Sequence, residues 1–275
     1  IELNVMQQAT IDALLNGKDD IVVLSPTGSG KTLSYLLPLS QLVDASSDEV
    51  QAVVVVPGRE LALQSANVLK DMGSGLRGMA CYGGRPTMDE HRKLREVKPQ
   101  IVFATPGRLN DHLDKLNIIA DNIKYLVLDE FDKCLEMGFH DEMQALISKL
   151  PHDVRSVLLS ATPAEELKDQ KIINSKFTTL NFLPEEEQVP DRVHIYKVES
   201  PQKDKLETLR QLLLTFGDAS SIVFLNFRES VERTADFLRE VGFSISYFHG
   251  GMEQKQREDA LYKFSNGSAN IFVST

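Results

Sequence analysis

The chain has 275 residues, enough for one large or two ordinary domains. Apolar residues make up 42% of it and charged residues 25%, as in a soluble globular protein, and no apolar run is long enough to span a bilayer. The net charge of −10 excludes a basic field over the whole surface, so a nucleic acid would have to bind in a local groove.

The cysteines and the start of the chain indicate the compartment. Cys81 and Cys134 are isolated and lack metal-ligand spacing, as expected for reduced thiols in a cytoplasmic protein. No signal peptide opens the chain, and we expect a monomer without membrane contact. Because the first residue is Ile1 and not Met, we expect a trimmed start. The histidines that we expect to lack metal-like partners are His112, His140, His152 and His194.

The first predicted strand, Ile21–Ser25, leads into the turn Ser25-Pro-Thr-Gly-Ser-Gly-Lys-Thr32, and leucines at helical spacing follow from Leu33. A glycine-rich turn that opens a helix binds phosphate, because backbone N–H groups and the helix dipole converge on anionic oxygens. Lys31 would reach the outer phosphates and Thr32 would ligate Mg²⁺. The predicted nucleotide-binding residues of this turn are Thr27, Gly28, Ser29, Gly30, Lys31 and Thr32. The alternative is a chance surface loop, since Ser25 stands where the strict pattern has glycine.

Short apolar runs and helical patterns alternate along the next part of the chain. Further strands are predicted at Ala52–Val56, Gly78–Tyr82, Ile101–Ala104, Tyr125–Leu128, Ser156–Leu159 and Thr178–Asn181. Helices are predicted at Glu60–Met72, Arg108–Leu116, Asp141–Leu150 and Glu165–Ile173. Repeated β–α–β order predicts an α/β fold with a parallel sheet, which binds ligands at the carboxyl ends of its strands.

Carboxylates follow the predicted strand Tyr125–Leu128 directly, in the segment Asp129-Glu130-Phe131-Asp132. Asp129 suits a hold on Mg²⁺, and Glu130 suits the orientation and deprotonation of an attacking water. The predicted catalytic residues are therefore Lys31, Asp129 and Glu130, with Thr32 and Asp129 on the metal. The alternative is an acidic cluster that only caps a strand or a helix.

A second α/β unit follows a break in the pattern. Two prolines and an acidic run predict a linker at 184–191, between a first lobe at 1–183 and a second at 192–275. Strands are predicted in the second lobe at Val193–Val198, Ile222–Leu225, Ser244–Tyr247 and Ile271–Ser274. Helices are predicted at Lys203–Leu214, Glu229–Glu240 and Gln254–Phe264.

In the order and spacing of these motifs the sequence resembles the DEAD-box RNA helicases, ATP-dependent enzymes with two RecA-like lobes of the P-loop NTPase fold. The resemblance implies that Gln7, ahead of Gly17-Lys-Asp19, contacts adenine. It also implies that Asp132 and the Ser160-Ala-Thr162 segment couple the ATP site to the nucleic-acid site, through Asp132, Ser160 and Thr162. Ser160 and Thr162 would in addition cap a helix before Pro163.

The resemblance further implies RNA contacts through the backbone, with little base specificity. Arg59 and Arg108 can hold phosphates bidentately, while glycines let backbone N–H groups approach the sugar-phosphate chain. The predicted RNA-binding residues are Pro57, Gly58, Arg59, Gly83, Gly84, Thr105, Pro106, Gly107, Arg108, Gln254, Arg257 and Thr275. The run His91–Arg95 is diluted by acidic neighbours, which favours a solvated helix face over an RNA patch.

The chain departs from the family pattern at several positions. Phe131 replaces an alanine, Gly58 replaces a threonine, and the aromatic residue that stacks on adenine would lie before Ile1. The second lobe is expected to be truncated, because Ile271–Thr275 resembles a strand that stops before its aspartate. No His-Arg-x-Gly-Arg segment follows, and the loss of such arginine fingers costs about 10³–10⁵ in rate.

The resemblance implies an RNA-dependent ATPase that uses Mg-ATP to unwind or remodel RNA duplexes locally, as its two lobes close and bend one strand. The 275-residue chain alone is expected to hydrolyse ATP near background, and protein partners would bind through flanking regions. The alternatives are an ATP-gated RNA clamp without useful unwinding, a DNA helicase of the same superfamily, and a nucleotide-binding scaffold. The retained Glu130 disfavours the scaffold.

Overall fold

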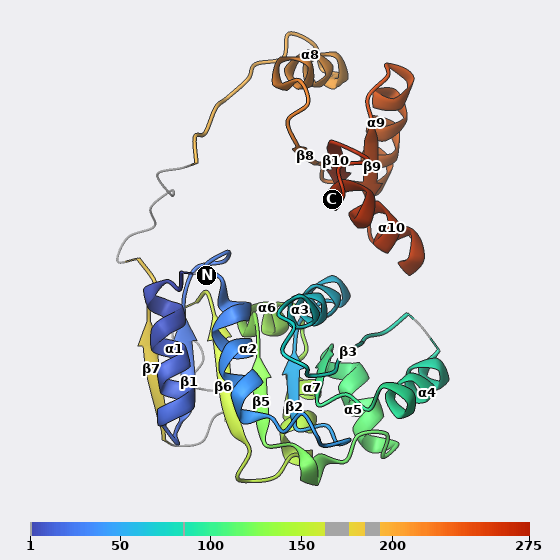
Figure 1. Ribbon diagram of the computed structural model, residues 1–275. Helices are drawn as coiled ribbons and strands as arrows, with labels where there is room; N and C mark the ends of the chain where they lie inside the picture. Colours follow the sequence, from blue (N-terminus) through green and yellow to red (C-terminus); the bar gives the residue numbers. More distant parts are fainter. Residues whose placement is uncertain (1, 85, 163–175, 185–192) are drawn as a thin grey trace. The chain divides into compact units, whose positions relative to one another are not determined.

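Figure 1 shows a computed structural model of the chain, which divides into the units Ile1–Gln188 and Val189–Thr275. The described residues are 2–84, 86–162, 176–184 and 193–275. The predicted limits, 1–183 and 192–275 with a linker at 184–191, stay predictions, since most of that linker lies outside the described residues.

The first unit is built on a seven-stranded sheet in the order β3-β4-β2-β5-β6-β1-β7. Its strands are β1 Asp20–Leu24, β2 Ala52–Val55, β3 Gly78–Cys81, β4 Ile101–Ala104, β5 Tyr125–Leu128, β6 Arg155–Ser160 and β7 Phe177–Asn181. Their pairs run parallel, as where Ile21 lies beside Val157 and Val53 beside Val102. The predicted parallel α/β sheet is therefore confirmed, and each predicted strand of this unit overlaps one that the structure forms.

Helices connect these strands. They are α1 Val5–Asn16, α2 Lys31–Leu42, α3 Arg59–Asp71, α4 Thr87–Val97, α5 Pro106–Asp114, α6 Phe131–Glu136 and α7 His140–Lys149, with a 3-10 turn at Ala120–Asn122. The helices predicted at Glu60–Met72, Arg108–Leu116 and Asp141–Leu150 are confirmed as α3, α5 and α7. The helix predicted at Glu165–Ile173 lies outside the described residues. In the described part of the chain, no helix combines the length and apolar character that crossing a bilayer requires.

The sheet buries apolar side chains on both of its faces. Ile21 and Val23 of β1 lie in one apolar cluster with side chains of α1, α2 and α3. Val22 and Leu24 lie in a second cluster with side chains of α4, α5, α6 and α7. Successive strand residues point to opposite faces, so a strand that is apolar throughout requires helices on both sides. The valine runs of β1 and β2 therefore specify a central position in the sheet.

Both ends of α1 are held by side chains. At the start, the Asn4 Oδ1 accepts the Gln7 N–H at 2.9 Å, while the Gln7 Oε1 accepts the Asn4 N–H at 3.0 Å. This reciprocal pair is a capping box, which satisfies N–H groups that the helix itself leaves open. At the other end, the Arg155 guanidinium from β6 donates to the carbonyls of Ala13, at 2.7 Å, and Leu14. The helix that carries Gln7 is thus fixed relative to the sheet.

The second unit holds a three-stranded parallel sheet in the order β8-β10-β9. Its elements are α8 Leu206–Phe216, β8 Ser221–Phe224, α9 Arg228–Glu240, β9 Ile245–Phe248, α10 Gln254–Ser265 and β10 Ile271–Ser274. The strands predicted at Ile222–Leu225, Ser244–Tyr247 and Ile271–Ser274 are confirmed, as are the three predicted helices.

The strand predicted at Val193–Val198 is wrong, since this segment is irregular in the structure. Ile195 is 78% exposed and Tyr196 is 83% exposed. The prediction rested on a short β-rich apolar run within a pattern of alternating strands and helices, and such a run says nothing about a neighbouring strand. A strand needs a partner for its N–H and C=O groups, and none of the described strands pairs with this segment.

A core substitution tests how the acidic segment is supported. Phe131 is fully buried in the cluster that also contains Leu128, Met143 and Leu158. We expect Phe131→Ala to lower the free energy of unfolding of the first unit by about 3–5 kcal/mol, because a cavity is left behind.

Urea unfolding followed by circular dichroism measures this change. Phe177→Ala on β7 is the matched control, because Phe177 is 41% exposed. A loss below about 1 kcal/mol for Phe131→Ala, no larger than the loss for the control, would contradict this account of the core.

Candidate nucleotide and nucleic-acid site

Three loops that carry predicted site residues lie at one edge of the first sheet. The phosphate turn follows β1, the acidic segment follows β5, and Ser160 ends β6. Because β5, β6 and β1 are neighbours and parallel, their carboxyl ends meet at the same edge. The Ser25 N–H also donates to the Ser160 carbonyl at 3.0 Å, which joins the turn to the end of β6.

The phosphate turn depends on two glycines in left-handed conformation. Gly28 has a φ of 79° and Gly30 a φ of 83°, a region that favours glycine. A Cβ on Gly30 would also lie 2.5 Å from the Gln7 Nε2. Gly30 is the N-cap of α2, and no side chain caps this helix start among the described residues. The backbone N–H groups at the start of α2 are thus available for an anion.

Gln7 lies against this turn. Its side chain is buried, and its Nε2 donates to the Gly30 carbonyl at 3.1 Å. The neighbouring Asn4 Nδ2 donates to the Ser29 carbonyl at 2.9 Å. The start of α1 and the phosphate turn are therefore joined by two hydrogen bonds. Both the donor and the acceptor of the Gln7 amide have protein partners here, and its contact with adenine stays a prediction.

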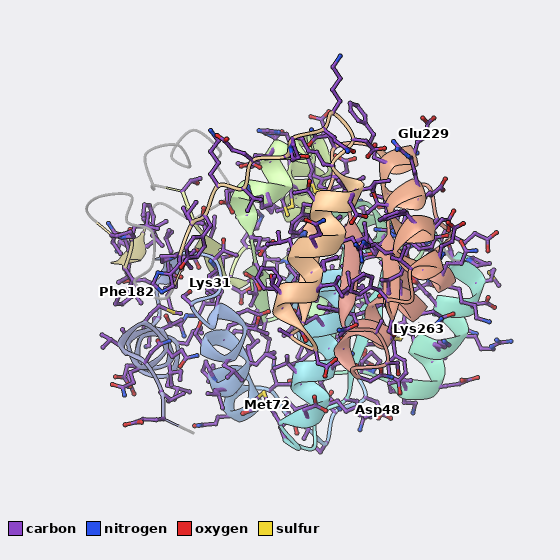
Figure 2. All side chains as sticks on the ribbon, turned by 90° about the horizontal axis from the view of Figure 1, so that it is seen from above. Lys31, Asp48, Met72, Phe182, Glu229 and Lys263 are labelled. Atoms are coloured by element: carbon purple, nitrogen blue, oxygen red, sulfur yellow. The ribbon has the colours of Figure 1, made fainter. Side chains whose placement is uncertain are left out.

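Lys31 is the first residue of α2 and is buried (Figure 2). Its Nζ donates to the Ser25 carbonyl at 2.9 Å and to the Pro26 carbonyl at 3.1 Å, so the side chain folds back over the turn. Burial lowers the pKa of the Lys31 ammonium, and the negative charges of Asp129, Asp132 and Glu130 oppose that shift. The amine is thus held above the turn beside three acidic residues.

Asp129 is buried at the end of β5 and hydrogen-bonded at both carboxylate oxygens. The Tyr35 hydroxyl donates to its Oδ2 at 3.1 Å, and the Glu130 N–H donates to its Oδ1 at 2.9 Å. Burial raises the pKa of Asp129 to about 6, while the hydrogen bond from Tyr35 opposes the rise. A buried carboxylate of this kind is stabilised by a nearby cation.

Tyr35 is the residue of this site that the sequence analysis missed. It is fully buried on α2, one helical turn after Lys31, and its hydroxyl donates to the Asp129 Oδ2 at 3.1 Å. Burial and the charge of Asp129 raise its pKa well above the usual range. The phenol thus joins α2, the helix that carries Lys31 and Thr32, to the carboxylate predicted to hold Mg²⁺. The available signal was a tyrosine, at position i+4 from Lys31, inside a leucine-rich helix.

Glu130 has an unusual backbone conformation, with a φ of 48° and a ψ of 48°. This left-handed region is uncommon for residues other than glycine and costs about 1–2 kcal/mol. Glu130 is the N-cap of α6, so the chain turns sharply between β5 and this helix. The turn leaves the Glu130 side chain partly exposed beside the buried Asp129.

Asp132 contacts the Ser160–Thr162 segment, as a coupling role requires. Its Oδ2 lies 3.4 Å from the Ala161 N–H, which donates to it. The Ser160 Oγ accepts the Thr162 N–H at 3.1 Å, and the two hydroxyls lie 3.0 Å apart. The coupling itself stays a prediction, and the helix expected after Pro163 lies outside the described residues.

Two of the elements predicted to bind RNA touch each other in the first unit. Pro57 and Gly58 follow β2, and Arg59 begins α3. A Cβ on Gly84 would lie 2.6 Å from the Arg59 Nη1, so the guanidinium packs against the Gly83–Gly84 backbone. Gly84 has a φ of 91°, which only glycine adopts readily. The structure thus brings these two elements together at the ends of β2 and β3.

The third element, Thr105–Arg108, begins α5, with Thr105 as N-cap and Pro106 in the first turn, followed by Gly107. The Arg108 side chain is only 10% exposed. Its Nη1 donates to the Thr87 Oγ1 at 2.6 Å, and its Nε lies 3.5 Å from the Glu90 Oε2. Arg108 is therefore paired inside the protein with residues of α4, and its contact with RNA stays a prediction.

The expectation that His112 lacks metal-like partners is wrong. Its ring lies with the Cys81 thiol and the Glu90 carboxylate in a buried group whose possible ligand atoms are all within 4.8 Å of one another. Because the run His91–Arg95 lies on α4, its predicted helical conformation is confirmed, but α4 also buries Glu90 and Leu94. Nothing in the sequence distinguished Glu90, which is buried, from the charged residues beside it that are exposed.

In the second unit, Thr275 directly follows β10, while Gln254 and Arg257 lie on α10. Thr275 and Asn226 line a cavity of about 510 Å³ together with Phe227, Arg228 and Glu229. On α10, the Gln254 Nε2 donates to the Glu258 Oε1 at 3.1 Å. The Arg257 guanidinium lies 4.7 Å from the centre of the Phe248 ring, a cation–π contact.

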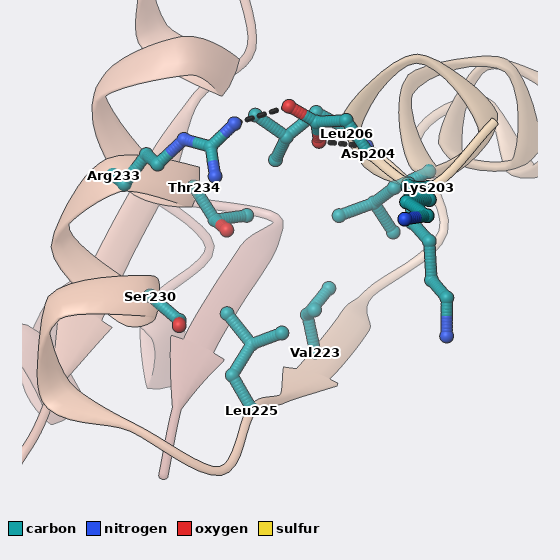
Figure 3. Close-up of a pocket in the computed structure, with 10 residues that line it drawn as sticks. Lys203, Asp204, Leu206, Val223, Leu225, Ser230, Arg233 and Thr234 are labelled. Carbon is teal, nitrogen blue, oxygen red and sulfur yellow. Dashed lines mark hydrogen bonds and ion pairs between the residues drawn. The ribbon is translucent and has the colours of Figure 1, made fainter.

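Figure 3 shows a different cavity of the second unit, about 550 Å³ in volume, between α8, β8 and α9. Its lining is apolar at Val223 and Leu225, and an ion pair between Arg233 and Asp204 bridges two of its walls. Its other lining residues are Lys203, Lys205, Leu206, Leu209, Ser230 and Thr234. The residues predicted to bind nucleotide or RNA do not line this cavity.

Two family models match the chain. The DEAD/DEAH box helicase model matches residues 4–170, and the helicase conserved C-terminal domain model matches residues 204–275. The first match includes the phosphate turn, the acidic segment and the three proposed RNA elements of the first unit. The second match includes α9, β9, α10 and β10.

Curated relatives agree with these matches. The ATP-dependent RNA helicase DbpA of Escherichia coli (strain K12) is 36% identical over 98% of this chain and 59% of its own length. The ATP-dependent RNA helicase FAL1 of Candida albicans is 31% identical over 98% of this chain and 68% of its own length. The chain thus spans a little over half to about two thirds of these relatives.

Solved structures of this family are also similar. A DEAD box protein from the hyperthermophile Methanococcus jannaschii is 29% identical, with a TM-score of 0.60, over 98% of this chain and 73% of its own. The DEAD-box helicase Mss116, bound to ssRNA and UDP-BeF, is 25% identical with a TM-score of 0.84, over 99% of this chain and 60% of its own. The matched segments, the relatives and the loops gathered at the sheet edge agree, and the chain belongs to the DEAD/DEAH box helicase family.

Proposed function

We propose that the protein is an RNA-dependent ATPase that locally unwinds or remodels RNA duplexes using Mg-ATP. The observation that carries the proposal is the group formed by Lys31, Tyr35 and Asp129 beside the phosphate turn. It combines a cation for phosphate, a buried carboxylate for a metal, and a helix start without a side-chain cap. The names of the relatives as ATP-dependent RNA helicases support the same reading.

The proposed Mg²⁺ ligands are the Thr32 hydroxyl and the Asp129 carboxylate. Tyr35 lies on α2, the helix that also carries Thr32, and its hydroxyl donates to the Asp129 carboxylate, so both proposed ligands are connected to one helix. Oxygen-only donors suit Mg²⁺. When bound, the ion would neutralise charge on the outer phosphates and on the buried carboxylate. The residues present therefore fit this ion.

Glu130 is the proposed base that orients and deprotonates the attacking water. Its left-handed backbone lets its side chain remain partly exposed next to the buried Asp129. The two neighbouring carboxylates therefore have different environments, which suits one for the metal and the other for a proton. We propose further that Asp132, Ser160 and Thr162 link this chemistry to RNA.

RNA is the proposed nucleic acid, held by backbone contacts from Pro57–Arg59, Gly83–Gly84 and Thr105–Arg108, with Gln254, Arg257 and Thr275 in the second unit. Exposed main chain at glycines suits contact with sugar and phosphate and gives little base specificity. We also propose that the protein is a cytoplasmic monomer and that protein partners bind through its flanking regions. The 275-residue chain has no His-Arg-x-Gly-Arg segment, and we propose slow hydrolysis by this chain alone.

The lysine of the phosphate turn gives the first test. We expect Lys31→Ala to weaken the binding of a non-hydrolysable ATP analogue by about 10–150-fold, because a charge-assisted hydrogen bond to phosphate is lost. Isothermal titration calorimetry measures the affinity. The exposed Lys18→Ala is the matched control, and equal affinities of the two variants would refute the role of Lys31.

Tyr35 gives a test with a pH dependence. The hydrogen bond from Tyr35 lowers the pKa of Asp129, which burial holds at about 6. In Tyr35→Phe the Asp129 carboxyl should have a higher pKa, so it should stay protonated up to a higher pH. A protonated carboxyl is a poorer metal ligand than a carboxylate.

The pH below which Mg²⁺ ceases to strengthen nucleotide binding should therefore rise in Tyr35→Phe. Titrations of the nucleotide between pH 5 and pH 8, with and without Mg²⁺, measure this effect. We expect a shift of about one pH unit or less for the loss of one neutral hydrogen bond. Binding without Mg²⁺ is the control and should change little. An unchanged pH profile would separate Tyr35 from the metal site.

Nucleic-acid preference tests the function itself. In the full-length protein we expect ATP hydrolysis to be stimulated by single-stranded RNA and not by DNA of the same sequence, because the proposed contacts include the 2′-hydroxyl. Short RNA duplexes should also be separated in the presence of ATP. Glu130→Gln should bind ATP and RNA but fail to turn over.

Equal stimulation by RNA and DNA would favour a DNA helicase. RNA binding and ATP hydrolysis that leave duplexes intact would favour an RNA clamp. Normal turnover by Glu130→Gln would overturn the assignment of the base.

A further inference from the structure

We propose that Glu90 of α4 is a positioning residue that fixes the Gly83–Gly84 turn and the Thr105–Arg108 segment relative to each other. The inference rests on the proposed function, because both segments are proposed to bind RNA. Glu90 has no place in the proposed contacts with nucleotide or RNA. It acts through its neighbours, and its effect should appear in RNA affinity.

Burial is the first step of the argument. The Glu90 side chain is only 5% exposed, although α4 is otherwise largely polar. A carboxylate that leaves water must be compensated by hydrogen bonds and by opposite charge. The partners of Glu90 therefore show what this residue holds in place.

One carboxylate oxygen holds the strand that leads into the glycine turn. The Glu90 Oε1 accepts the N–H of Tyr82 at 3.1 Å. Tyr82 is itself buried and directly precedes Gly83. This bond joins α4 to the end of β3, and it fixes the direction in which the chain enters the turn.

The other oxygen holds α5. The Glu90 Oε2 lies 3.0 Å from the His112 Nε2 and 3.5 Å from the Arg108 Nε. Arg108 and His112 are four residues apart, so they lie on the same face of α5. The Arg108 guanidinium supplies the opposite charge, and it belongs to the segment that is proposed to bind RNA.

The hydrogen bonds of His112 assign its tautomer. The Asn117 Nδ2 lies 3.1 Å from the His112 Nδ1, and an amide nitrogen can only donate. The Nδ1 is therefore the acceptor, and the Nε2 carries the proton that it donates to Glu90. Both ring nitrogens of His112 are thus hydrogen-bonded, and among the described residues the Arg108 guanidinium lies beside the Glu90 carboxylate.

The far side of the turn is held by Arg59, whose guanidinium packs against Gly84. The Gly83–Gly84 turn is therefore held on one side by the contact with Arg59 of α3. On the other side it is held by the hydrogen bond that the preceding Tyr82 N–H donates to Glu90 of α4. Through Glu90 and Arg59, three separate RNA elements are joined into one surface. Such preorganisation reduces the ordering cost that binding would otherwise include.

The same residues raise the alternative of a metal site formed by Cys81, Glu90 and His112. Three observations oppose it. The His112 and Glu90 groups already satisfy each other, and the Arg108 cation lies beside the carboxylate, where it repels a metal ion. Burial also raises the pKa of the Cys81 thiol, which disfavours the thiolate that a metal requires.

Glu90→Gln tests the proposal with little change in volume. Its amide has only one oxygen, so it cannot accept from Tyr82 on one side and from His112 and Arg108 on the other, and one of the two contacts should fail. We expect the RNA concentration for half-maximal ATPase of the full-length protein to rise by about 10-fold or more. The rate at saturating RNA and the affinity for nucleotide should change less than about twofold, since Glu90 contacts neither.

The matched control is Glu96→Gln, an exposed glutamate of the same helix, which should behave as the wild type. Hydrogen exchange gives a second measurement that does not need RNA. The Tyr82 amide should exchange faster in Glu90→Gln than in Glu96→Gln, because its acceptor is weakened.

Equal half-saturation of the two variants by RNA, or equal exchange of the Tyr82 amide, would overturn the proposal. A loss of RNA affinity in the wild type after treatment with a zinc chelator would identify a metal site and would also overturn it. If wild-type ATPase does not respond to RNA at all, the proposed function fails. The exchange of the Tyr82 amide still decides whether Glu90 holds the turn.

Discussion

The burial of one carboxylate, that of Asp129, is the constraint on which the nucleotide site depends. A charge inside a parallel sheet must be compensated, and here the Tyr35 hydroxyl and the Glu130 N–H do so at the two oxygens. Tyr35 requires α2 to start directly after the phosphate turn, so that its phenol reaches the end of β5. The conformation of the turn, the position of Lys31 and the sharp bend at Glu130 all follow from this arrangement.

Much of the fold could be predicted because the signals were local and repeated. Valine-rich runs such as Ala52–Val56 are apolar on both faces, which only a central strand of a covered sheet satisfies. The phosphate turn was predictable for a similar reason, since Gly28 and Gly30 have backbone angles that other residues rarely adopt. The segment Val193–Val198 shows the limit of such local signals, because an apolar run does not by itself provide a neighbouring strand.

Two residues of functional interest could not be predicted, and the reason is the same for both. Tyr35 and Glu90 act on partners far away in the sequence, at Asp129 and Arg108, and neither lies in a motif that predicts its contact. Helical periodicity places a residue on a face but does not say which side chain it meets. For the same reason the ion pair of Arg108 was not expected. A phosphate-binding arginine and a buried structural arginine look alike in sequence.

The left-handed backbone of Glu130 has a consequence for the evolution and engineering of this site. Glycine would occupy that conformation without strain, so the position should gain stability by about 1–2 kcal/mol when its side chain is deleted. A search for more stable variants would therefore select against the proposed proton acceptor. The strained backbone therefore lies at the residue that is proposed to act on the water. A substitution there that raises the stability of the fold should lower the rate of ATP hydrolysis.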